Sequence, residues 1–72
     1  MMPLALLGVG ESGTITDIRG KEDVIHHLHN LGFAAGTDVE VVGNTDAGMI
    51  IAVKGSRVAL NLGIASKITV NR

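Results

Sequence analysis

The sequence predicts a small, mainly β domain: a partly open β-barrel of about five short strands, with one helix inserted after the first strand. Runs of alternating apolar and polar residues recur between glycine-containing turns, as expected for half-buried strands. Only residues 21–31 place apolar side chains at helical spacing. The 72 residues include a single aromatic one, so the core must consist of Val, Ile, Leu, Ala and Met. One domain is expected to fill residues 1–72.

The first strand is predicted over residues 14–19. This segment is rich in β-branched residues, which favour strands. Its two isoleucines, Ile15 and Ile18, are out of step with a period of two. A β-bulge near Thr16 and Asp17 would reconcile them.

The helix is predicted to run from about Lys21 to Leu31, with Gly20 as its N-cap. Glu22 and Asp23 would then lie in the first turn, where the positive end of the helix dipole stabilises carboxylates. The residues that indicate one apolar helix face are Val24, Ile25, Leu28 and Leu31.

The end of this helix has a specific pattern. Gly32 lies where a chain leaving a helix adopts a positive φ at no steric cost. If Gly32 is the C′ residue, Phe33 is C″ and Leu28 is C3, and these two positions share an apolar contact in a Schellman ending. After a second glycine, Gly36, residues 38–41 alternate with a period of two and predict the second strand.

Three more strands are predicted in the second half of the chain. Asn44–Gly48 has the composition of a loop. Gly55–Ser56 fits a two-residue hairpin with glycine first, as a type II′ turn requires. Gly63–Ser66 is interpreted as a brief crossover turn before a last strand, Ile68–Val70. The apolar residues that share a strand face are Met49, Ile51 and Val53 before the hairpin, and Val58, Leu60 and Leu62 after it.

Composition excludes several classes of function. The chain has no cysteine, which rules out disulfides and thiol catalysis and favours a reducing cytoplasm. Six basic and seven acidic residues, scattered and without stacking aromatics, argue against nucleic-acid binding. No apolar run reaches membrane-spanning length. Met1–Leu7 lacks the basic leader of a secretion signal, so we expect it to begin the folded domain.

Two catalytic patterns are weak. The string formed by Gly8, Gly10 and Gly13 matches a dinucleotide fingerprint, but that motif must follow a strand and open a helix. Here Gly13 opens onto a predicted strand, so the glycines are interpreted as turn residues. The serines lack a nucleophile-elbow motif, and all three histidines lie on the one predicted helix.

One polar helix face is a candidate metal site. Glu22, His26 and His29 fall within one narrow sector, because they are four and three positions apart and each helical residue turns about 100°. A carboxylate with two imidazoles suits Fe(II), Zn(II) or Ni(II). A solvated polar face explains the same residues more simply, because a surface cluster lacks the surrounding partners that orient metal ligands.

The order of these segments resembles the FeoA-type accessory proteins of ferrous iron transport. The matching segments cover nearly the whole chain: Pro3-Leu4 with Leu7; Gly10-Glu11, Gly13 and Ile15; Leu31-Gly32, Gly36-Thr37 and Val39-Glu40-Val41; Val53 to Leu60; and Ala65 to Val70. The chain departs from the family at three positions. Ala35 stands where proline usually precedes glycine, Leu6 where a polar residue is usual, and Val9 where proline is frequent. The last two add apolar surface near the N-terminus.

The resemblance implies an SH3-like barrel, no enzymatic activity and no required cofactor. It also implies a cytoplasmic protein that works with a membrane ferrous iron permease carrying a GTP-binding domain. Docking would shift the conformational or assembly equilibrium of the permease, which requires different affinities for its states. The predicted docking surface consists of Leu6, Leu7, Leu31, Gly32, Ala34 and Ala35.

Two other interpretations follow from the residues. The first is a transition-metal sensor or carrier that binds Fe(II) or another divalent ion weakly through the helix carboxylate and imidazoles. The second is a peptide-binding barrel, which is disfavoured because the aromatic side chains that line proline-recognition grooves are missing.

Overall fold

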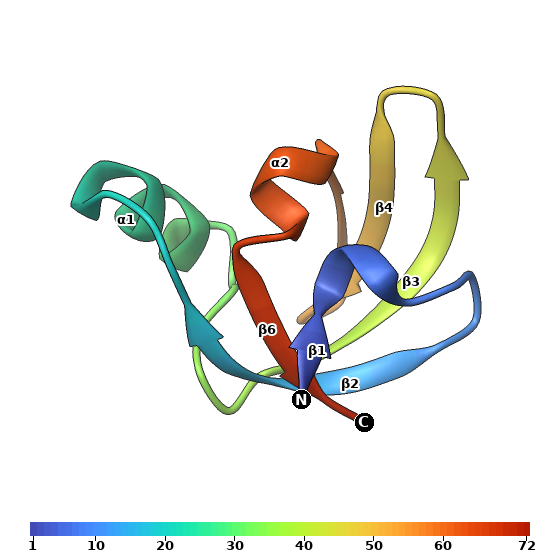
Figure 1. The fold of residues 1–72 in the computed structure, drawn as a ribbon, viewed down its shortest axis with the longest axis horizontal. Helices are drawn as coiled ribbons and strands as arrows, with labels where there is room; N and C mark the ends of the chain where they lie inside the picture. Colours follow the sequence, from blue (N-terminus) through green and yellow to red (C-terminus); the bar gives the residue numbers. More distant parts are fainter.

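The computed structural model describes residues 1–72 and forms one antiparallel sheet of six strands in the order β1-β6-β2-β3-β4-β5. The sheet curves around a common interior, with α1 to one side and α2 above β1 (Figure 1). The elements in chain order are β1 (Met2–Pro3), the 3-10 turn η1 (Leu4–Leu6), β2 (Ser12–Ile18), α1 (Glu22–Asn30), β3 (Asp38–Thr45), β4 (Gly48–Val53), β5 (Ser56–Leu60), α2 (Leu62–Ala65) and β6 (Ile68–Asn71). The predicted mainly β, partly open architecture is confirmed.

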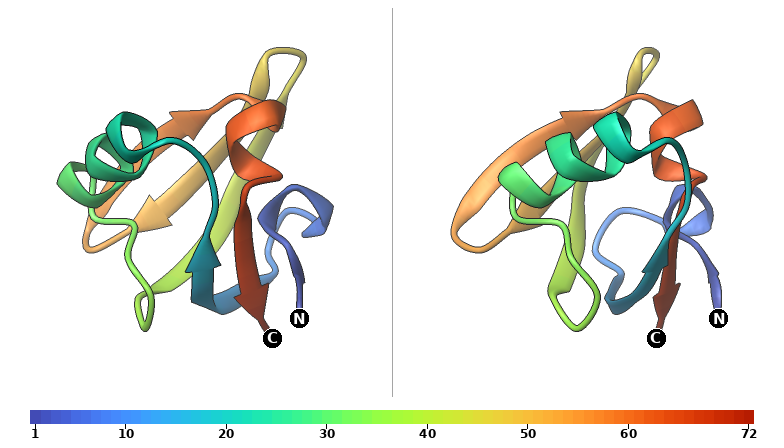
Figure 2. Two further views of the ribbon diagram at one scale, coloured as in Figure 1. Left: turned by 60° about the vertical axis from the view of Figure 1, so that its left-hand side comes forward. Right: turned by 90° about the vertical axis from the view of Figure 1, so that its left-hand side faces the viewer.

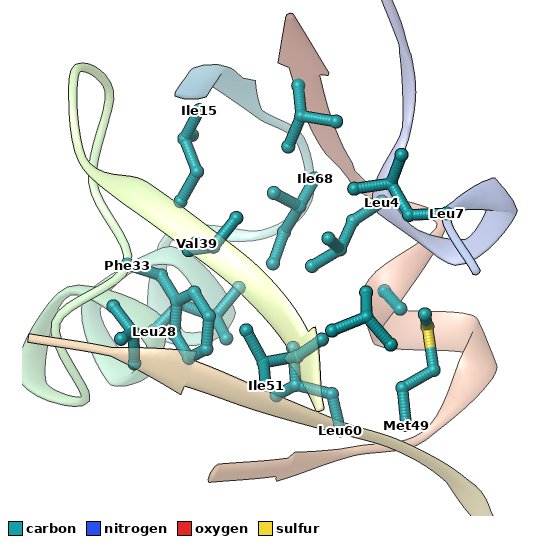
Figure 3. Packing of buried hydrophobic residues seen from close by; sticks show 14 residues of the cluster. Leu4, Leu7, Ile15, Leu28, Phe33, Val39, Met49, Ile51, Leu60 and Ile68 are labelled. Carbon is teal, nitrogen blue, oxygen red and sulfur yellow. The ribbon is translucent and has the colours of Figure 1, made fainter. Parts of the chain in front are cut away.

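The interior is entirely apolar. Fourteen buried hydrophobic residues form one cluster, and no buried residue is polar or charged. Its largest side chain is Phe33, which lies among aliphatic residues from strands and helices (Figure 3). The alternation predicted for β4 is confirmed, since Met49, Ile51 and Val53 are all buried. Burial of such side chains is the main favourable term in folding.

The predicted bulge in the first long strand is confirmed. The pairing of β2 with β6 shifts register between Ile15 and Asp17. Ile15 is therefore buried and Ile18 is half-buried against the same core. The bulge adds one residue to β2, which returns the two side chains to one face.

The predicted Schellman ending of α1 is confirmed. The amide of Phe33 donates to the carbonyl of Leu28 at 2.9 Å, and the amide of Gly32 donates to that of His29 at 3.0 Å. Gly32 has φ of 104°, in the left-handed region. The start of the helix differs from the prediction: Lys21, not Gly20, is the N-cap, and it makes no side-chain capping bond.

The predicted hairpin turn at Gly55–Ser56 is wrong by one residue. Strand β4 pairs with β5 through Val53 and Ser56, so Lys54 and Gly55 form the turn. Both have positive φ, 48° and 78°, which makes the turn type I′ instead of type II′. A lysine in the left-handed region is uncommon and gives no signal in the sequence.

Other differences concern short elements. The predicted crossover turn at Gly63–Ser66 is the helix α2, so Leu62 is an exposed helix residue and does not extend the face of β5. The predicted loop Asn44–Gly48 shrinks to a turn at Asp46 and Ala47, because β3 and β4 pair as far as Thr45 and Gly48. Strand β1, which pairs with β6, was not predicted from the sequence.

Candidate docking groove

A mainly apolar groove of about 230 Å³ runs between α1 and the end of β5. Figure 2 shows α1 lying alongside the orange strand β5 in both views. Six of the eight residues that line the groove are hydrophobic. The lining comprises Val24, His27, Leu28 and Leu31 from α1, and Ala59, Leu60, Asn61 and Ile64 from the β5–α2 segment.

The helical repeat determines which side chains of α1 enter the groove. Positions three and four apart lie on the same helix face, so Val24, His27, Leu28 and Leu31 share it. Leu28 is buried and anchors α1 to the core, whereas Val24 and Leu31 are half-buried at its two ends. The same face therefore holds the helix in place and leaves apolar surface at the groove.

A helix cap shapes the opposite wall. The Asn61 side-chain oxygen accepts a hydrogen bond from the Ile64 amide at 2.8 Å. Asparagine is among the preferred N-cap residues because it satisfies an amide that has no partner within the helix. The cap starts α2 directly after β5 and positions Ile64 beside Leu60 in the groove lining.

The electrostatic surroundings of the groove are simple. No acidic residue lines it. The protein has two ion pairs, Arg19 with Asp17 at 3.9 Å and Arg72 with Glu11 at 2.6 Å. Lys54 and Arg57 take part in neither of them, and both are exposed.

The structure divides the predicted docking residues into separate places. Leu31 lines the groove and Gly32 follows it, half-buried, at the end of α1. Ala34 and Ala35 belong to the next turn and do not line the groove. Leu6 is 67% exposed on η1, outside the groove.

Leu7 does not belong to a docking surface. Its side chain is 2% exposed and packs in the core with Leu4. The prediction of Leu7 as a docking residue is wrong, because η1 turns the chain so that Leu7 points inward and Leu6 outward. Figure 3 shows Leu7 next to Leu4 among the core side chains.

The candidate metal ligands lie on the solvent side of α1. Glu22, His26 and His29 are all exposed and none of them lines the groove. No three His, Asp or Glu side chains are grouped in a way that could hold a metal ion. The structure thus places the predicted residues on one face without assembling them into a site.

The glycine string near the N-terminus has a structural role. Gly13 lies within β2, and the amide of Gly8 donates to Glu11 Oε1 at 2.6 Å. A strand, not a helix, follows Gly13, so the helix N-terminus that would bind a pyrophosphate is missing at this point.

The groove wall formed by the β5–α2 segment was not predicted from the sequence. The apolar face of α1 was recognised, but its partners Ala59, Asn61 and Ile64 lie some thirty residues further along the chain. The only local signal for this wall is the asparagine before a short apolar run, which is a common N-cap pattern.

Comparison with known proteins identifies the family. The model of the FeoA domain family matches residues 2–72. The chain belongs to the FeoA domain family. A Methanocaldococcus jannaschii protein with the provisional name Fe(2+) transport protein A is 33% identical over 70 residues, which cover 97% of this chain and 85% of that protein.

Solved structures agree with this assignment. The crystal structure of an iron uptake regulatory protein (FeoA) has a TM-score of 0.90 and 28% identity, and the match covers 97% of this chain and 93% of that one. Stenotrophomonas maltophilia FeoA, described as a prokaryotic SH3 domain protein and solved in complex with zinc, has a TM-score of 0.85 and 22% identity. That match covers 99% of this chain and 91% of the other, and it confirms the SH3-like FeoA fold. No helix of this FeoA-family chain is long and apolar enough to cross a membrane.

Proposed function

We propose that this FeoA-family chain is a non-enzymatic, cytoplasmic accessory protein of ferrous iron transport. It docks to a membrane Fe(II) permease that carries a GTP-binding domain. The family membership and the relative named Fe(2+) transport protein A support the pathway. The observation that supports docking is the apolar groove between α1 and β5, which lies outside the closed core and is open to a partner.

Docking regulates the permease only if the affinity differs between its states. A ligand with equal affinity for two conformations shifts neither population, however tightly it binds. We therefore expect the chain to bind the GTP-bound, GDP-bound and nucleotide-free forms of the domain with different affinities. A tenfold difference corresponds to about 1.4 kcal/mol of coupling.

Calorimetric titration of the whole chain into the isolated GTP-binding domain tests this proposal. We expect binding in at least one nucleotide state, and weaker binding by Leu31→Gln, which places an amide in the groove. Leu62→Gln is the matched control, because the same change then falls on an exposed leucine that does not line the groove. Absence of heat in all three nucleotide states would contradict the proposal.

A second candidate is a transition-metal sensor or carrier. The zinc complex of Stenotrophomonas maltophilia FeoA favours it, as does the exposed set of Glu22, His26 and His29 one helical turn apart. The second candidate predicts that zinc binding depends on the two histidines, whereas docking does not involve them.

A further inference from the structure

Strand β5 is an open edge of the sheet. It is the last strand in the sheet order, and β4 is its single neighbour. The register pairs Val53 with Ser56 around the two-residue turn and Ile51 with Val58. Because paired residues in an antiparallel ladder alternate, Arg57 and Ala59 direct their backbone N–H and C=O groups away from β4.

Nothing else in the protein satisfies these outward groups. No turn, cap or side-chain hydrogen bond involves Arg57 or Ala59. Both residues are exposed. An open strand edge of this kind is a ready template for pairing with another extended chain.

The open edge and the apolar groove coincide. Ala59 and Leu60 of β5 form one wall of the groove, and the apolar face of α1 forms the other. A chain laid along β5 would exchange backbone hydrogen bonds with Arg57 and Ala59. Its alternate side chains would point to one face, toward residues such as Leu28 and Leu31. This mode of binding requires no aromatic platform.

Charge differs between the two ends of the groove, although no Lys, Arg, Asp or Glu lines it. The stem of Lys54 lies over Gly32, directly after Leu31, and Arg57 is on the edge itself. Neither basic group has an ion-pair partner. The end next to Leu31 is therefore basic. At the Val24 end the stem of Lys67 lies over Gly20, and the first turn of α1 carries Glu22 and Asp23.

We infer that the β5 edge binds an extended segment of the partner, apolar at alternate positions and acidic at the end that lies next to Lys54 and Arg57. The inference depends on the proposed function at one point: the partner that supplies this segment is the permease domain. A second copy of this chain fits less well, because Ser56–Leu60 contains no carboxylate to place there.

Synthetic peptides test the recognition mode directly. The probes are peptides of alternating valine and threonine with aspartates at either the N-terminal or the C-terminal end, titrated into the whole chain while backbone amide shifts are followed by NMR. We expect the amides of Arg57, Ala59 and the groove face of α1 to shift with at least one aspartate peptide. Versions with lysine in place of aspartate should bind about tenfold more weakly.

Two matched pairs of variants locate the binding. Ala59→Pro removes the outward amide but no hydrogen bond to β4, because the Ala59 N–H points away from β4. Proline is tolerated on an edge strand when its nitrogen faces solvent. Ala35→Pro is the matched control, because it also removes an amide that donates no hydrogen bond, at a turn that does not line the groove. His27→Glu adds a carboxylate to the groove, and His26→Glu adds the same charge to the same helix outside it. We expect Ala59→Pro and His27→Glu to weaken aspartate-peptide binding about tenfold, and the two controls to leave it within about twofold.

The outcomes separate this inference from the proposed function. Shifts confined to other surfaces, or no shifts at all, would overturn strand addition at β5. Self-association through β5 would show that the edge pairs with a second copy of this chain and would overturn the acidic partner segment. If the permease domain binds, and Ala59→Pro and His27→Glu do not weaken it, docking stands and the groove is not its site. If the peptides bind as expected but the permease domain does not, the edge recognises an acidic strand and the permease proposal fails.

Discussion

The amide of Phe33 donates to the carbonyl of Leu28 at 2.9 Å, across the glycine that ends α1. This bond brings the single aromatic side chain and the buried leucine of the helix into the same core, where both are almost fully enclosed. The chain then turns directly toward β3. The junction thus couples the end of the helix to the packing of the interior.

Gly32→Ala tests the conformation on which this junction depends. Its φ of 104° is costly for any residue with a Cβ, whereas an added methyl would meet only ordinary contacts with Val53 and Lys54. We expect a loss of about 1–2 kcal/mol in the free energy of unfolding, measured by urea denaturation. Gly43→Ala is the control, because that glycine is outside the left-handed region and faces the flexible end of Ile50. Equal losses for both variants would mean that backbone strain is not the cause.

Ala35→Pro is expected to stabilise the fold by about 0.4–1 kcal/mol, by restricting the unfolded chain. The amide of Thr37 donates to the carbonyl of Ala34 at 3.0 Å and Gly36 has φ of 90°, which defines a type II turn with Ala35 at its first corner. The Ala35 amide donates no hydrogen bond, so proline removes none. Thermal unfolding measures the effect. Thr37→Pro should lower the midpoint because it deletes the turn bond, and a lowered midpoint for Ala35→Pro would refute the turn assignment.

Glu11→Ala is expected to cost about 1 kcal/mol, mainly through the Gly8 amide, which donates to Glu11 Oε1 at 2.6 Å. The second oxygen of the same carboxylate pairs with Arg72 at 2.6 Å, but the Arg72 side chain is more than half exposed. Exposed ion pairs are screened and contribute little, so Arg72→Ala should cost less than about 0.5 kcal/mol. Urea unfolding of both variants measures the ranking. A larger loss for Arg72→Ala would show that the ion pair dominates.

Zinc titration tests the metal candidate. Glu22, His26 and His29 are exposed and not grouped for coordination, so we expect zinc titration to give the same heat with His26→Ala/His29→Ala as with the wild-type chain. His27→Ala, on the groove side of the same helix, is the matched control. Zinc heat that disappears in the double variant and persists in His27→Ala would favour the sensor or carrier.

Local features were predicted from sequence because their causes are local. The bulge near Asp17 follows from two isoleucines out of register, and the ending of α1 follows from a glycine four residues after Leu28. The hairpin turn that contains Lys54 could not be predicted from local sequence in the same way. Closure of the β4–β5 ladder imposes a positive φ on a residue type that seldom adopts it, so the turn was placed one position too late.

The docking surface is a second feature that local sequence could not predict. Leu6 and Leu7 are identical side chains in adjacent positions, yet one is exposed and the other buried, because η1 directs them to opposite sides. Periodicity could not separate them in a segment with no regular repeat.

The sequence by itself determined the mainly β class, the single long helix, the helix ending and the resemblance to FeoA. Each depends on spacings of a few residues or on the order of short segments. Only the tertiary structure decided that β5 is an open edge and that α1 faces it across a groove. Those features arise where residues 24–31 meet residues 59–64, and their proximity depends on how the sheet curves around the core.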